Sequence, residues 1–192
     1  AIVAAQTGSV NYAAAPSVTQ TFDVVRASQT ALSFAPATPQ SFASTQTLFV
    51  AAGSGTGTVS FAVLSGPGQI ENGADLVAGS GTGDIVARAF KTSDALYESA
   101  TAVATVICAK AAQFITFPQP SNSAANVGAE LEATASSSLA VEYEIVSGPG
   151  RVEARSMVVF SSTGLVVVAA DQPGDLDYAA AVTVTRTVSV SQ

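Results

Sequence analysis

The chain is organised around one four-residue phrase, Ser-Gly-Pro-Gly, which occurs twice and each time follows a run of alternating side chains. Residues 65–68 follow the run at 59–64, and residues 147–150 follow the run at 141–146. Apolar–polar alternation is the period-2 pattern of a half-buried β-strand, and Gly-Pro marks a turn. Because the same strand and turn return after about 80 residues, the sequence predicts a tandem array of one β-rich unit.

A second repeated feature is a hairpin with a tyrosine just before its last strand. The tyrosines are Tyr12, Tyr97 and Tyr178, and Val18 matches Val184 on the last strand. The chain thus holds three copies of the hairpin but only two of the strands that precede it. An isolated hairpin is marginally stable and leaves strand edges unpaired, so it must find another sheet. Residues 1–25 are therefore either the terminal hairpin of a preceding repeat or an intersubunit docking arm, and both interpretations remain open.

The rest of the chain divides into two domains, at residues 26–109 and 110–192. Each has about seven short apolar runs with turn residues every 8–12 positions or so and no amphipathic helix. This pattern predicts an all-β chain of tandem Ig-like Greek-key β-sandwiches, preceded by an orphan β-hairpin. The short linkers between the parts favour a stiff rod. The predicted strands are 29–34, 46–52, 58–64, 69–70, 75–77, 85–90 and 103–108, then 113–118, 130–135, 141–146, 151–153, 157–160, 165–170 and 182–190.

Alternation also assigns side chains to faces. The residues predicted to point into the cores are Val141, Tyr143 and Ile145 in the second domain and Val59, Phe61 and Val63 in the first. Glu142 and Glu144 are predicted to face solvent. On the last strand, Val103 and Ile107 align with the inward-facing Val184 and Val188, which places Cys108 on the outer face.

Charge and hydropathy narrow the choice of partners. The chain carries 14 acidic and 7 basic residues, a net charge of −7, and the basic residues are scattered. No basic patch could follow a phosphate backbone, so nucleic acid is not an expected partner. The longest apolar run, 165–170, is far shorter than the roughly 18 residues of a membrane span, so no membrane insertion is expected. No signal peptide is visible, and the start at Ala1 rather than Met favours a fragment or a processed product.

Catalytic groups are sparse. The chain has no histidine, which removes the commonest general base and metal ligand. Glu142, Glu144 and Glu153 lack an aromatic cleft, so a glycosidase pair is disfavoured. The Gly-Ser-Gly-Thr-Gly stretches at 53–57 and 79–83 precede strands rather than helices, so they predict turns rather than phosphate-binding loops. We expect no enzyme, no catalytic residue and no cofactor.

Two further features have a structural and a functional interpretation. Asp171, Asp175 and Asp177 could offer oxygen ligands to calcium, but the equivalent loops do not keep the acids, so a solvated turn is favoured and no metal is predicted. Cys108 is predicted to be a bystander, with a disulfide between chains as the alternative. The repeated tyrosines are predicted to pack between sheets and to hydrogen-bond backbone through their hydroxyl groups.

At these residues the chain resembles the bacterial immunoglobulin-like tandem repeats, of the MBG-like type, of long secreted or cell-surface proteins. The phrases that carry the resemblance lie at 113–117, 135–141, 146–150 and 177–181, and with their counterparts they extend over essentially the whole chain. The resemblance implies a tandem, extracellular, non-enzymatic module that serves as a spacer, stalk or adhesive element. The two Gly-Ser-Gly-Thr-Gly loops depart from the repeated pattern and could carry a role specific to the first domain.

The sequence therefore predicts a non-catalytic extracellular or bacterial cell-surface structural protein: a stalk, an adhesin spacer or a filament subunit. Its expected partners are further repeats of the same chain or identical subunits, joined by β-strand addition through residues 1–25. The alternative is a module that binds a glycan or a host-surface protein through interstrand loops such as 72–75 or 171–177.

Overall fold

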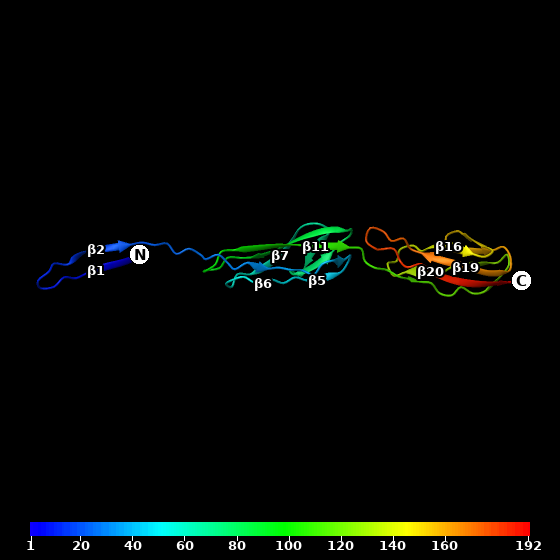
Figure 1. Cartoon of the computed structure of the whole chain (residues 1–192), viewed down its shortest axis with the longest axis horizontal. Helices are drawn as coiled ribbons and strands as arrows, with labels where there is room; N and C mark the ends of the chain where they lie inside the picture. The colour runs from blue at the N-terminus through cyan, green and yellow to red at the C-terminus, as the bar shows by residue number, and fades with distance from the viewer.

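The computed structural model describes residues 1–192 and contains β-strands but no α-helix. Figure 1 shows three parts in a row along the long axis: an N-terminal hairpin and two sandwiches. The hairpin consists of β1 (Ile2–Gln6) and β2 (Ala15–Gln20). Unit one comprises strands β3 to β11, and unit two comprises β12 to β20. The chain has no helix long and apolar enough to cross a membrane.

Two β layers enclose the core of unit two. One layer has the order β13-β20-β19-β16, and the other is formed by β12 with β15 and by β14-β18-β17. β13 runs parallel to β20, whereas the other pairs are antiparallel. The strands are β12 (Ile115–Thr116), β13 (Ser123–Ala124), β14 (Gly128–Glu130), β15 (Thr134–Ala135), β16 (Glu142–Ser147), β17 (Gly150–Glu153), β18 (Met157–Phe160), β19 (Gly164–Asp171) and β20 (Val184–Ser191).

Unit one repeats this topology. Its layers are β4-β11-β10-β7 on one side and β3 with β6 and β5-β9-β8 on the other, with β4 again parallel to the last strand. Two layers joined in this order form an Ig-like Greek-key sandwich, so the predicted fold class is confirmed. The strands are β3 (Leu32–Ser33), β4 (Gln40–Ser41), β5 (Thr45–Thr47), β6 (Ala51–Ala52), β7 (Val59–Ser65), β8 (Gly68–Glu71), β9 (Asp75–Ala78), β10 (Gly83–Lys91) and β11 (Ala100–Ala109).

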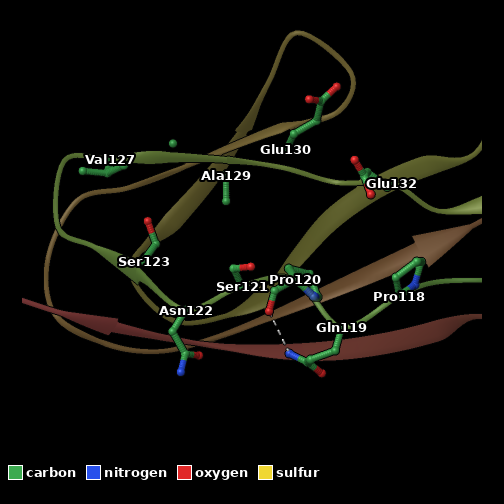
Figure 2. Close-up of a pocket in the computed structure, with 11 residues that line it drawn as sticks. Pro118, Gln119, Pro120, Ser121, Asn122, Ser123, Val127, Ala129, Glu130 and Glu132 are labelled. Atoms are coloured by element: carbon green, nitrogen blue, oxygen red, sulfur yellow. Dashed lines mark hydrogen bonds between the residues drawn. The ribbon is translucent and has the colours of Figure 1, made fainter.

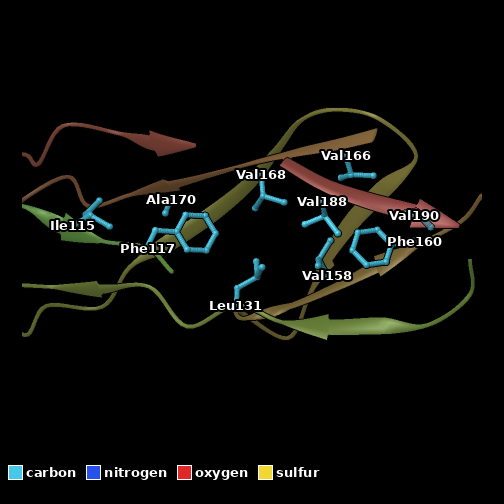
Figure 3. Packing of buried hydrophobic residues seen from close by; sticks show 10 residues of the cluster. All are labelled: Ile115, Phe117, Leu131, Val158, Phe160, Val166, Val168, Ala170, Val188 and Val190. Carbon is cyan, nitrogen blue, oxygen red and sulfur yellow. The ribbon is translucent and has the colours of Figure 1, made fainter. Parts of the chain in front are cut away.

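Each unit has its own hydrophobic core, formed by side chains from both layers. Figure 3 shows the core of unit two, where Phe117, Leu131 and Phe160 of one layer face valines of the other. An aromatic pair extends each core, with ring centroids 5.8 Å apart for Phe34 and Phe61. The equivalent pair in unit two, Phe117 and Tyr143, has centroids 5.7 Å apart. The smaller core of unit one consists of Leu48, Leu76, Ala78, Ile85, Val106 and Cys108.

The predicted faces of β16 are confirmed. Val141, Tyr143 and Ile145 pack against the core while Glu142 and Glu144 are exposed. Phe61 and Val63 pack likewise in unit one. Val59 is 41% exposed, so its predicted burial is wrong.

The strand boundaries differ from the prediction in the second strand of each unit. The runs at 46–52 and 130–135 are each divided, into β5 and β6 and into β14 and β15. Leu48 and Leu131 lie between the halves and are buried in the cores. The two-residue strands β4 and β13 were not predicted, because a parallel pairing of two polar or small residues leaves no periodicity in the sequence.

The predicted orientation of Cys108 is wrong. Ile85 pairs with Val106 and Val166 pairs with Val188, so Val106 is the counterpart of Val188 and Cys108 that of Val190. The segment between the repeated tyrosine turn and the paired valine of the last strand is one residue shorter in unit one, from Tyr97 to Val106 instead of from Tyr178 to Val188. A shift of one residue exchanges the faces of a strand. Cys108 is therefore 2% exposed, whereas Val103 and Ile107 point to solvent.

Candidate assembly surfaces

A four-residue turn lies at the tip of the last hairpin of unit two. The N–H of Asp175 donates to the carbonyl of Tyr178 at 3.1 Å, which closes the turn. The Asp175 carboxylate accepts from the N–H groups of Asp177 and Tyr178, both at 2.8 Å. An aspartate that bonds the backbone two and three residues ahead stabilises a tight turn. We call residues 175–178 the tip of unit two.

The same tip occurs three times in the chain. In unit one, the N–H of Asp94 donates to Tyr97 O at 3.0 Å, and Asp94 Oδ1 accepts from Leu96 N and Tyr97 N. In the hairpin, the N–H of Ser9 donates to Tyr12 O at 2.8 Å. The three tyrosines thus close equivalent turns, and Asn11, Leu96 and Asp177 occupy the same position. The hairpin tip is residues 9–12, and the unit-one tip is residues 94–97.

In both units, the backbone of the linker that precedes the unit forms hydrogen bonds with the tip. The N–H of Ala111 donates to Asp177 O at 2.8 Å, and Ala179 N donates to Ala111 O at 2.9 Å. Ala27 makes the equivalent bonds with Leu96 O and Glu98 N at 2.8 and 2.9 Å. Each tip is therefore tied to the segment that enters its own unit.

A glutamine amide reinforces this attachment. Gln113 Nε2 donates to Ala179 O at 2.7 Å, and Gln29 Nε2 donates to the equivalent Glu98 O at 2.6 Å. In unit two, Ser137 Oγ donates to Gln113 Oε1. Gln29 Oε1 in unit one is buried without a hydrogen-bond partner. The amide of unit one is thus the less completely satisfied of the two.

The tip of unit two also docks onto unit one. Ser80 Oγ lies 2.8 and 2.9 Å from the two carboxylate oxygens of Asp177 and donates to them, and Gly81 N donates to Asp177 Oδ1 at 2.6 Å. The rings of Phe42 and Tyr178 meet edge to face across the same boundary, with centroids 5.5 Å apart. Charge-assisted and aromatic contacts thus combine at one place, which we call the joint.

The loop at 79–83 supplies the unit-one side of the joint. It is a turn between β9 and β10, and Gly81 has a φ of +97°, which a side chain rarely adopts. The thiol of Cys108 lies beneath it, with Sγ 3.2 Å from Gly81 O. Burial, and then the nearby Asp177 charge, raise the pKa of the Cys108 thiol. The burial of Cys108 disfavours the alternative of a disulfide between chains.

The other Gly-Ser-Gly-Thr-Gly loop, at 53–57, is fixed within unit one. Asp94 Oδ2 accepts from the N–H of Thr56 at 2.6 Å, and Lys91 Nζ donates to Gly55 O at 3.2 Å. Hydrogen bonds from Leu96 N, then Thr56 N and Tyr97 N, lower the pKa of Asp94. Strand β7 follows this loop, so no helix N-terminus is available to hold a phosphate.

The N-terminal hairpin has the register of the last hairpin of unit two. Ala4 pairs with Val18 as Ala170 pairs with Val184, and Ile2 pairs with Gln20 as Val168 pairs with Arg186. β19 and β20 have β16 and β13 as outer neighbours, whereas β1 and β2 form a two-stranded sheet. The face that corresponds to the core is exposed, with Ile2 63% and Val18 57% accessible. Both edges and one apolar face of the hairpin are thus uncovered.

Asp171, Asp175 and Asp177, which the sequence offered as calcium ligands, each have a different hydrogen-bond partner. Asp171 accepts from Thr183 Oγ1, Asp175 closes the tip and Asp177 forms the joint. No group of three metal-ligating side chains lies close enough together to bind an ion. Glu142 and Glu144 are exposed on β16, and Glu153 pairs with Arg151 at the surface.

A polar hollow of about 430 Å³ lies on unit two between the 118–123 segment and β14. Figure 2 shows Gln119 and Asn122 at one rim and Glu130 at the other. Gln119 Nε2 donates hydrogen bonds to the carbonyl oxygens of Pro120 and Thr187. No aromatic side chain lines the hollow, so it lacks the flat apolar surface on which a sugar ring would stack.

The tyrosine hydroxyl groups do not act as predicted. Tyr12, Tyr97 and Tyr178 make no hydroxyl hydrogen bond to the backbone, and they lie at the tips rather than between the sheets. Tyr143 has that role instead: its hydroxyl accepts from Ala133 N at 2.7 Å and donates to Leu131 O at 3.1 Å. The hydroxyl lies near the core, and burial raises the Tyr143 pKa.

Comparison with known proteins gives structural likenesses only. No protein-family model matches the sequence, and no curated protein matches it. The chain is similar to the titin domains z1z2 solved in complex with telethonin, at 16% identity and a TM-score of 0.42 over 86% of this chain and 98% of that one. It is also similar to Drosophila N-cadherin EC1-3, at 12% identity and a TM-score of 0.31. That match covers 81% of this chain and 61% of the N-cadherin chain. TM-scores below 0.5 do not establish a shared fold, so the fold assignment rests on the sheet topology.

Proposed function

We propose that the chain is a non-catalytic structural protein of the bacterial cell surface or exterior: a stalk, adhesin spacer or filament subunit joined through its N-terminal hairpin. The observation that carries the proposal is the hairpin itself. It keeps the strand register of a sandwich hairpin, yet β1 and β2 have no outer neighbours and their apolar face is exposed. Strand addition would pair the edges, and the opposite layer of the sandwich that the hairpin joins would cover its apolar face.

The joint supports the mechanical part of the proposal. Asp177 and Tyr178 contact Ser80, Gly81 and Phe42 in a joint that spans the two units. A tandem array with hydrogen-bonded, aromatic joints resists bending more than an array on flexible linkers. The absence of histidine from the sequence agrees with a role without general-base catalysis.

The binding-module alternative gains no specific support. The 171–177 loop is engaged by the joint through Asp177, and Asp75 in the 72–75 loop is bonded to Thr47 Oγ1 and Asn72 Nδ2. The polar hollow of unit two has no aromatic lining. A glycan or protein ligand would have to bind outside these two loops and outside the hollow.

Amide hydrogen exchange tests strand addition. Exchange at β1 and β2 is measured on the whole chain, dilute and concentrated. We expect the amides of β1 to become protected on concentration, and Val18→Asp on the apolar face to abolish the protection. Thr19→Asp adds the same charge on the opposite face and should leave it intact. Exchange at β1 that is independent of concentration in the unmodified chain would contradict the proposal.

A further inference from the structure

The two sides of the joint each recur once more in the residues described, where no other part of residues 1–192 meets them. Its two sides are a tip, which carries Asp177 and Tyr178, and a receiving surface, which carries Ser80, Gly81 and Phe42. Because the units are repeats, the hairpin has a tip of the same kind and unit two has a receiving surface of the same kind. Backbone hydrogen bonds establish the equivalence at the start of the receiving loop and at the position of Phe42.

The receiving surface of unit two lies at the loop between β18 and β19. The N–H of Ser161 donates to Pro149 O at 2.9 Å, as Gly79 N donates to Pro67 O at 2.7 Å. Ser162 therefore follows this bond as Ser80 does, and it is exposed. The loop is one residue shorter in unit two, because two residues separate Ser161 from Gly164 where three separate Gly79 from Gly83. Ala125 N donates to Ser191 O as Phe42 N donates to Ala109 O, so Ala125 stands where unit one has the phenyl ring of Phe42.

The hairpin tip offers the complementary groups. Tyr12 is 77% exposed and Val10 is 99% exposed, in the positions of Tyr178 and Leu176. Asn11 occupies the position of Asp177, and its side chain makes no hydrogen bond within the chain. The amide oxygen of Asn11 can accept from a hydroxyl or an N–H group as the Asp177 carboxylate does. The unit-one tip cannot replace it, because Leu96 stands at that position.

We propose that the hairpin tip of one copy docks onto the 161–164 loop of unit two in a second copy, and so repeats the joint from end to end between chains. Asn11 accepts from Ser162 and from the backbone of Thr163, and Tyr12 lies over Ala125. A head-to-tail contact of this kind propagates as an open filament rather than closing as a dimer. The inference rests on the proposed assembly role and specifies its axial contact.

The contact between copies is weaker than the joint within the chain. Asn11 is neutral, so its hydrogen bonds lack the charge assistance that Asp177 provides. Ala125 offers no ring to Tyr12, and the backbone bonds of Ala111 belong to the covalent linker. Association is consequently expected only at high local concentration, such as that of subunits held side by side by strand addition.

Sedimentation velocity on the whole chain tests the contact, at about 0.15 M salt, where the Debye length is about 8 Å and charge repulsion is screened. We expect Asn11→Asp to raise the association constant about fivefold, since it restores the charged acceptor. Ser162→Ala should cancel that gain, and the double variant defines the coupling between the two positions. Gln20→Glu, which adds the same charge elsewhere on the hairpin, should give no gain.

Three outcomes would overturn the contact: a gain that survives Ser162→Ala, an equal gain from Gln20→Glu, or no association of Asn11→Asp combined with Ala125→Phe. The last variant recreates both side-chain contacts of the internal joint, so its failure to associate at the highest concentration measured would be decisive. Protection of β1 in hydrogen exchange does not depend on the tip. If positions 11 and 162 show no coupling while β1 is still protected, the end-to-end contact is refuted and strand addition stands.

Discussion

The carboxylate of Asp177 accepts a 2.6 Å hydrogen bond from the backbone N–H of Gly81, although the two residues belong to different sandwiches. Ser80 adds its hydroxyl to the same carboxylate. One side chain of unit two thus connects a hairpin tip to a glycine-rich loop of unit one. The second Gly-Ser-Gly-Thr-Gly loop, which departs from the repeated pattern, thereby gains a structural role.

Removal of the Asp177 carboxylate should loosen the joint without unfolding either unit. Asp177→Ala leaves both cores intact, so the melting temperatures should change little while the units reorient more freely. Residual dipolar couplings or small-angle scattering would detect the broader distribution of orientations. Asp23→Ala removes an exposed carboxylate of the same charge and serves as the control. Equal rigidity of Asp177→Ala and the unmodified chain would show that the joint depends on other contacts.

Truncation of Phe160 should strongly destabilise unit two. Phe160 is fully buried among residues of both layers, and replacing a buried Phe by Ala costs about 3–5 kcal/mol. Urea unfolding followed by a probe in unit two gives the change in the free energy of unfolding. Glu144→Ala on the solvent face of β16 should stay within about 0.5 kcal/mol of the unmodified chain. Similar losses for the two variants would refute the assigned faces.

The hydroxyl group of Tyr143 should contribute separately from its ring. Tyr143→Phe keeps the contact with Phe117 but leaves Ala133 N–H and Leu131 O without this partner. We expect a loss of about 1–2 kcal/mol in the free energy of unfolding. Tyr12→Phe, at a hydroxyl group that makes no hydrogen bond to the backbone, is the matched control and should be neutral.

Acid should release the 53–57 loop from Asp94. Its pKa is lowered in the folded state by hydrogen bonds from Leu96, Thr56 and Tyr97 N–H groups. A lowered folded pKa means that the stabilisation is complete above the unfolded value of about 3.9 and is lost as the pH falls through the folded value. The protection factor of the Thr56 amide, which corrects for the slower intrinsic exchange in acid, should therefore fall below about pH 4. Asp94→Asn should weaken this dependence, whereas Glu98→Gln, at an exposed carboxylate, should preserve it.

The thiol of Cys108 should report on the unfolding of unit one. Cys108 is 2% exposed and its pKa is raised by burial, so the reactive thiolate is scarce and inaccessible in the folded chain. A thiol reagent should label it slowly in buffer and rapidly in denaturant. Rapid labelling of the folded chain would mean that β11 turns Cys108 outward, as the sequence alignment predicted.

The sequence predicts the sandwiches well because alternation carries most of the information. Tyr143 and Ile145 face the core and Glu142 and Glu144 face solvent, as the pattern indicates. It fails at Cys108 because the choice between two registers depends on one residue in the loop before β11, and strand faces reverse with that choice.

The joint could not be predicted from spacing. Ser80 and Asp177 are far apart in the chain, and both belong to segments whose composition indicates only a turn. The absence of an aspartate from the equivalent positions Asn11 and Leu96 was a usable signal. It indicates that the Asp177 carboxylate serves a contact of the unit-two tip rather than a calcium site shared by the repeats.

The most direct test of the account is electron microscopy of the negatively stained chain over a range of concentrations. The account predicts filaments, or end-to-end rows of rods, that shorten when Val18→Asp removes the apolar face of the hairpin. Separate short rods at every concentration, with the hairpin unengaged, would contradict the assembly role.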